Sequence, residues 1–255
     1  MVFGANHPNL DAPLHNLAQL LASRGNFEDA DTLCRRRYAV IATYERLSGQ
    51  GYPRWAQHVL QHSEILSQQG ILSGIEIQER ILTETRAQFG PDHLYVAGLE
   101  RALGECLMAN LESAEARPHF ETALRICQRN PQGKVPGRLT QVGLAAAWRE
   151  IGDIERARAL LAQVLTDWEL DPKPVWSAVG EAAFELAVCD FRSGRLIESE
   201  RWIRKSLGSY RQAADRFENA GHFLGQASAV YEQILQAQGR SPREIQQELA
   251  AVVSH

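Results

Sequence analysis

The stretch LAAAWREIGDIERARALL, residues 144–161, decides the fold, because it has the pattern of two helices joined by a glycine turn. A large and a small residue, Leu144 and Ala145, stand eight and seven positions before Gly152. A small and a large residue, Ala157 and Leu161, stand five and nine positions after it. Small residues let two antiparallel helices approach closely, and glycine supplies the left-handed conformation that ends the first helix. The stretch therefore predicts a helical hairpin.

The same pattern recurs along the chain at an interval of about 42 residues. Because one helix pair cannot bury both of its faces, successive pairs must stack on one another. The sequence therefore predicts an all-α fold, an α-solenoid of antiparallel helix pairs. The turn residues, 45, 41, 42, 42 and 45 positions apart, are Gly25, Gly70, Leu111, Gly152, Gly194 and Gly239. The large residues eight positions before them are Leu17, His62, Leu103, Leu144, Leu186 and Tyr231.

Two of these units resemble a tetratricopeptide repeat. Residues 16–34 and residues 103–124 carry its large and small residues at the matching positions. The interval of about 42 residues, and the connector FGPDH at residues 89–93, are similar to those of kinesin light chain repeats. The resemblance implies a right-handed superhelix with a concave groove that binds other proteins.

One solenoid domain is predicted for residues 1–255, with five repeats and a C-terminal cap. Repeat 2 has His62, Ser63 and Glu79 where apolar or small residues are expected, so we predict that this helix pair is distorted or partly exposed. Repeats 1 to 5 are expected at roughly 8–50, 53–90, 93–131, 135–172 and 175–218, with capping helices within 222–252.

Composition and charge argue against several classes of function. The net charge is −4, and no long run of like charges is present, so binding to nucleic acid is not expected. The densest basic patch, residues 35–37, is expected to be a solvated helix face. No apolar run approaches the roughly twenty residues of a membrane span. Four scattered cysteines, and an N-terminus without a leader pattern, favour a cytoplasmic location.

Motifs for catalysis and metal binding are also absent from the sequence: there is no GxSxG, P-loop, HExxH or EF-hand pattern. His58 and His62 have the one metal-like spacing, because residues four apart share a helical face. No further ligands can be named beside them. We therefore expect His62 to replace a core leucine and His58 to be solvated, and we predict no enzyme activity, metal or cofactor.

The resemblance also implies which residues line the groove, namely those ten, six and three positions before each turn. Repeats 1 to 3 contribute polar groups, whereas repeats 4 and 5 contribute an apolar strip that the cap would either cover or leave open. The residues expected to contact a partner are His15, Gln19, Glu64, Arg101, Glu105, Val142, Arg149, Phe184, Val188 and Phe191.

These features favour a non-catalytic scaffold or adaptor that binds a protein partner in its groove. Relatives that bind chaperone tails hold a carboxylate with lysines and asparagines, but here His15, Leu60 and Arg101 occupy the lysine slots. An extended peptide or an amphipathic helix is therefore the expected partner. The alternative is a regulatory sensor that binds a small peptide or metabolite and changes the shape of the superhelix.

Overall fold

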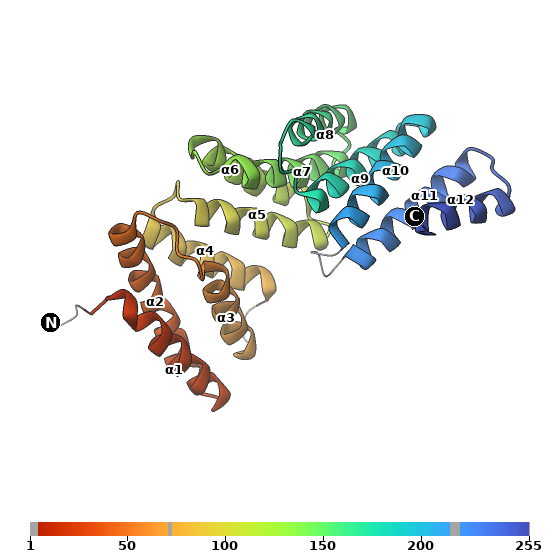
Figure 1. The fold of residues 1–255 in the computed structure, drawn as a ribbon. Helices are drawn as coiled ribbons and strands as arrows, with labels where there is room; N and C mark the ends of the chain where they lie inside the picture. The colour runs from red at the N-terminus through yellow and green to blue at the C-terminus, as the bar shows by residue number, and fades with distance from the viewer. Residues whose placement is uncertain (1–4, 71–72, 215–219, 255) are drawn as a thin grey trace. The chain divides into compact units, whose positions relative to one another are not determined.

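The computed structural model describes residues 5–70, 73–214 and 220–254, and these residues form helices and connecting turns without any strand (Figure 1). The all-α fold is confirmed. A short 3-10 helix, η1 (Pro8–Leu10), precedes the first α-helix. The α-helices are α1 (Asp11–Ser23), α2 (Phe27–Ser48), α3 (Trp55–Gln68), α4 (Gly74–Phe89), α5 (Leu94–Ala109), α6 (Ser113–Arg129), α7 (Lys134–Glu150), α8 (Ile154–Glu169), α9 (Trp176–Arg192), α10 (Leu196–Ala213), α11 (Ala220–Ala237) and α12 (Pro242–Ser254).

The chain divides into two compact units. Unit 1 consists of Met1–Glu112 and Arg125–Gly133, and unit 2 of Ser113–Leu124 and Lys134–His255. In unit 1 each helix from α1 to α4 packs on the next, and α1 also contacts α3 while α2 contacts α4. In unit 2 each helix from α7 to α11 packs on the next, and α9 also contacts both α7 and α11. Contact between corresponding helices of successive pairs is the packing of an α-solenoid.

The predicted turns are confirmed in the backbone. Gly25, Gly152 and Gly194 have φ angles of 76°, 92° and 72°, which lie in the left-handed region. Leu111, which occupies the glycine position of repeat 3, has a φ of 65°, and it is the one non-glycine residue with a positive φ in the described part of the chain. Its side chain is 90% exposed, so the turn there is held without any packing of the leucine.

The small residues expected at helix crossings are buried. Ala30, Ala116 and Ala157 are all fully buried, as the repeat pattern predicts. Leu144 is also buried, whereas Leu17, the corresponding residue of repeat 1, is 45% exposed. The large residue eight positions before the turn is therefore part of the core in repeat 4 but not in repeat 1.

The second helix of repeat 2 begins later than the repeat pattern predicts. In repeats 1, 3, 4 and 5 the N-cap residue directly follows the turn residue. In repeat 2 the N-cap is Ser73, three residues after Gly70. The buried positions of α4 therefore include Ile77 and Ile81, and Glu79 is exposed.

The late start of α4 and the exposed Glu79 agree with the predicted distortion of repeat 2, but His62 of its first helix does not. His62 is completely buried and hydrogen-bonded within unit 1.

None of the described helices is both long and apolar enough to cross a membrane.

Candidate partner-binding site

A hollow of about 430 Å³ lies between α1 and α3 in unit 1. Residues on each side follow a spacing of three or four, so the hollow is bordered by one face of each helix. Three residues predicted for the groove, His15, Gln19 and Glu64, meet there. The lining consists of His15, Gln19, Ala22 and Ser23 of α1 and Gln57, Leu60, Gln61, Glu64, Ile65 and Gln68 of α3.

A buried hydrogen-bond network lies at one edge of this α1–α3 hollow. Arg37 of α2 is 1% exposed, and its Nε donates to Asp11 Oδ1 at 2.8 Å. Its Nη1 donates to Gln61 Oε1 at 2.6 Å. Gln61 Nε2 in turn donates to the backbone oxygen of His15 at 3.0 Å. The network thus links α1, α2 and α3, and it holds in place two residues that line the hollow.

The same network bears on which nitrogen of His15 carries the hydrogen. Its Nδ1 lies 2.8 Å from Gln61 Oε1 and 3.3 Å from Arg37 Nη1. A flipped Gln61 amide would set its oxygen against the His15 carbonyl and its NH₂ group against the arginine, so the orientation described is the one that satisfies both ends. Gln61 Oε1 only accepts and Arg37 Nη1 only donates, so the two contacts favour opposite tautomers of the neutral ring. The contact with Gln61 is the shorter one, and it favours a hydrogen on Nδ1, which leaves Nε2 as an acceptor.

Comparison with known families addresses the first repeat directly, because residues 14–54 match the tetratricopeptide repeat model. Repeat 1 is a tetratricopeptide repeat. No curated protein matches the chain. The fold is similar to BtubC (BKLC) from P. vanneervenii, with a TM-score of 0.56 and 17% identity over 82% of this chain and 83% of that one.

A second solved structure has a related fold. It is a variant of the nearly identical TPR-like repeats of a kinesin light chain from Podosopora anserina. The TM-score is 0.50, and the identity is 18% over 82% of this chain and 98% of that one. Both likenesses show the tetratricopeptide-type solenoid fold.

Two further groove positions implied by the tetratricopeptide repeat lie on α5 of unit 1. Arg101 and Glu105 are one helical turn apart and form an ion pair with each other. Neither residue lines the α1–α3 hollow. Their charges are therefore partly satisfied within α5.

Two groove positions on α7 are enclosed within unit 2. Val142 is 1% exposed, and Arg149 is 9% exposed. Arg149 Nη2 and Nε lie 2.9 Å and 3.0 Å from Glu185 Oε2, and the guanidinium also contacts Glu150. Because α7 packs against both α8 and α9, these residues do not face an open groove as expected.

The apolar strip on α9 is partly enclosed as well. Phe184, Val188 and Phe191 are half-buried. Both phenylalanines pack against a core cluster that includes Ala227 and Tyr231 of α11. The C-terminal helices thus cover part of the surface that the sequence offered as a partner site.

His58 differs from its prediction, because it is completely buried rather than solvated. The rings of Tyr38, Trp55 and His62 surround it, with centroids 4.5, 5.8 and 6.2 Å away. Neither ring nitrogen has a hydrogen-bond partner, and burial holds the pKa of His58 well below its usual 6.5. In the residues that the structure describes, no group of three metal-ligating side chains is found.

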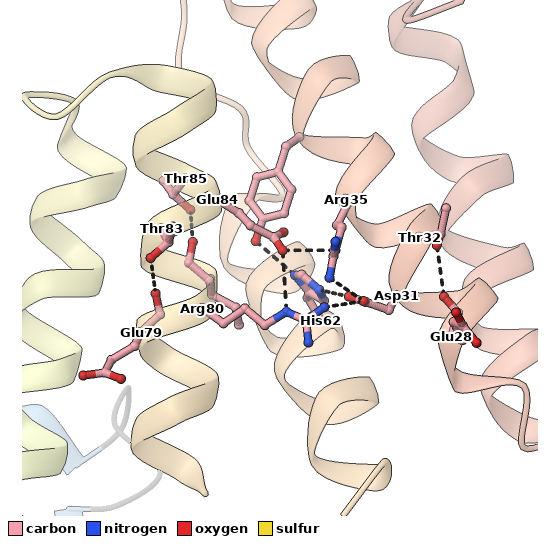
Figure 2. A network of polar contacts seen from close by, with 12 residues as sticks. Glu28, Asp31, Thr32, Arg35, His62, Glu79, Arg80, Thr83, Glu84 and Thr85 are labelled. Atoms are coloured by element: carbon pink, nitrogen blue, oxygen red, sulfur yellow. Dashed lines mark hydrogen bonds and ion pairs between the residues drawn. The ribbon is translucent and has the colours of Figure 1, made fainter. Parts of the chain in front are cut away.

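Figure 2 shows a network that joins α2, α3 and α4 around Asp31. His62 Nε2 donates to Asp31 Oδ1 at 2.7 Å, and the Tyr38 hydroxyl lies 3.1 Å from His62 Nδ1. Arg35 and Arg80 bind the other carboxylate oxygen at 2.9 Å and 2.6 Å. Such a carboxylate–histidine–hydroxyl series can activate a nucleophile. Tyr38 is only 2% exposed, however, and burial raises the pKa of its hydroxyl far above the usual range, so the series stabilises the helix packing.

The ion pairs in this part of α2 were not predicted from the sequence. The basic patch at residues 35–37 was expected to be a solvated face, but Arg37 is buried and paired while Arg35 is exposed and bound to Asp31. One available signal was helical spacing: Asp31 and Arg35 are four residues apart, which places them on one helical face.

Proposed function

We propose that the chain is a non-catalytic interaction scaffold that binds an extended peptide segment in the α1–α3 hollow. One observation carries the proposal: groove positions from two successive first helices, at His15, Gln19 and Glu64, border a single open hollow. The tetratricopeptide repeat, which covers most of α1 and all of α2, supports a binding role, because folds of this type generally present a surface to other proteins.

The dimensions of the hollow suit a short extended segment. On α3 the lining runs from Gln57 to Gln68, which corresponds to about 16 Å of helix. An extended chain advances about 3.3 Å per residue, so about five residues fit along it. The glutamine amides offer donors and acceptors to a peptide backbone. Leu60, which is 69% exposed, offers apolar contact.

An array of immobilised random peptides of about twelve residues tests this proposal, with the purified intact chain as the probe. Leu60→Ala removes the exposed apolar contact, and it should weaken binding to the positive spots by about threefold to tenfold. Leu47→Ala is the matched control, because Leu47 is 68% exposed in the same unit and lies outside the hollow.

The comparison of the two leucine variants decides the outcome. Reduced binding by Leu60→Ala with unchanged binding by Leu47→Ala supports the α1–α3 site. An array with no positive spots, or equal binding by both variants and the wild type, contradicts it.

A further inference from the structure

The described lining of the α1–α3 hollow carries a negative charge without a positive one. Its described lining residues include one carboxylate, Glu64, and no lysine or arginine. Glu64 is exposed, and its contact with the Gln68 amide is long, at 3.4 Å. Arg37 lies nearby, but it is 1% exposed and its charge is paired with Asp11. A ligand in the hollow therefore meets a negative charge that no lining cation neutralises.

Two hydrogen-bonding groups of the hollow act as acceptors, in keeping with this charge. The contact of His15 Nδ1 with Gln61 Oε1 leaves His15 Nε2 as an acceptor in the neutral ring. Gln61, which lies beside it, uses its amide on the His15 carbonyl and on Arg37. Two of the polar side chains that border the hollow, His15 and Glu64, thus offer acceptors to a partner that donates hydrogen bonds.

We propose that the hollow selects an extended peptide segment with one lysine or arginine side chain. Glu64 binds the cationic side chain, and His15 Nε2 accepts a hydrogen bond from an N–H group of the segment. This inference rests on the proposed function, since it specifies the partner of the same site.

The spacing along α3 adds a sequence rule for that segment. Leu60 and Glu64 are one helical turn apart, which is about 6 Å along the helix axis. Two residues of extended chain span a similar distance of about 6.6 Å, and their side chains point to the same side. An apolar residue over Leu60 therefore stands two positions away from the basic residue over Glu64.

Fluorescence anisotropy with a matched set of labelled peptides tests the inference. The peptides share one alanine–serine backbone with a leucine, and they differ only two positions from that leucine, where they carry lysine, arginine, glutamine or glutamate. We expect the lysine and arginine peptides to bind about threefold tighter than the glutamine peptide, the size of one exposed ion pair. The glutamate peptide should bind about tenfold more weakly than the lysine peptide, and added salt should reduce both differences.

Charge variants of the chain show whether Glu64 is responsible. Glu64→Gln should abolish the preference, and Glu64→Lys should reverse it in favour of the glutamate peptide. Glu79→Gln is the matched control, because Glu79 is exposed in the same unit and lies outside the hollow. Glu64 is exposed, so these variants are expected to fold.

Each outcome bears on a different claim. A preference for basic peptides that Glu64→Gln removes and Glu79→Gln retains supports the inference. Binding without a charge preference, or a preference that Glu64→Gln leaves intact, overturns the inference while the proposed function stands. If none of the peptides binds, the inference is overturned. The proposed function is then tested separately by the peptide array.

Discussion

At the scale of single residues, unit 1 differs from a simple apolar solenoid core because it buries polar side chains. Arg37 is 1% exposed and is compensated by Asp11, Gln61 and neighbouring groups. Removing one partner of a buried ion pair costs about 3–5 kcal/mol, because the remaining charge stays buried. The buried ring of His58 has no hydrogen-bond partner, so it is the polar group that stabilises this core least.

His58→Leu should reduce the acid sensitivity of folding. Burial, and then the positive charge of Arg37, lower the pKa of His58 well below 6.5 in the folded chain. Above about pH 6.5 the ring is neutral in both states, so it adds no pH dependence. Below that pH the unfolded chain takes up the proton first, and the free energy of unfolding falls by up to about 1.4 kcal/mol per pH unit. Urea unfolding followed by circular dichroism from pH 8 to pH 5 should therefore show a flatter profile for the variant.

The same experiment has an outcome that would contradict the role assigned to His58. No hydrogen bond is lost in His58→Leu, since neither ring nitrogen has a partner. The variant should therefore be at least as stable as the wild type at pH 8. Parallel pH profiles for the two proteins would show that His58 is not the group that takes up the proton.

Leu111→Gly should stabilise the turn between α5 and α6. A left-handed conformation costs an L-residue about 1–2 kcal/mol relative to glycine, and the 90% exposed leucine contributes little packing. We expect the free energy of unfolding to rise by about 1 kcal/mol, measured by urea titration. Leu170→Gly is the control, because Leu170 is 79% exposed at the end of α8 but has a φ of −82°. A gain of equal size in the control would contradict the explanation.

At the scale of helices, small buried residues set how closely the two members of a pair approach. Ala157 of α8 is fully buried, whereas Ala159, two positions later on the same helix, is exposed. The two alanines have the same propensity for helix but opposite surroundings. They therefore separate the effect of packing from that of helix formation.

Ala157→Leu should overpack the crossing and lower the free energy of unfolding by about 1–3 kcal/mol. Ala159→Leu places the same side chain in solvent and should change it by less than about 0.5 kcal/mol. Thermal unfolding followed by circular dichroism compares the two variants. Equal melting temperatures for both would mean that the assigned helix register is incorrect.

The helices could be predicted from sequence because the turn glycines and the alternating large and small residues are local signals. Glu79 was set at an apolar position because positions were counted from Gly70, although Ser73 and Glu76 form a capping box that marks the start of α4. His15, Gln19 and Glu64 line one hollow, and their role in binding a partner stays a prediction. Val142 and Arg149 are buried instead of facing an open groove, because burial there depends on how α9 packs over α7, which no single repeat encodes.

At the scale of the whole molecule, the candidate sites fall in different units. The α1–α3 hollow belongs to unit 1, whereas Phe184 and Phe191 belong to unit 2 and pack against a cluster that includes residues of α11. A partner bound at one site would protect different helices from a partner bound at the other. The location of binding can therefore be measured without knowing the natural partner.

The most direct test of the account is amide hydrogen exchange of the intact chain, with and without the tightest peptide from the array. Binding in the α1–α3 hollow predicts slower exchange in Asp11–Ser23 and Trp55–Gln68, with no change in Trp176–Arg192. Slower exchange confined to Trp176–Arg192, around Phe184 and Phe191, would contradict the account and place the site in unit 2.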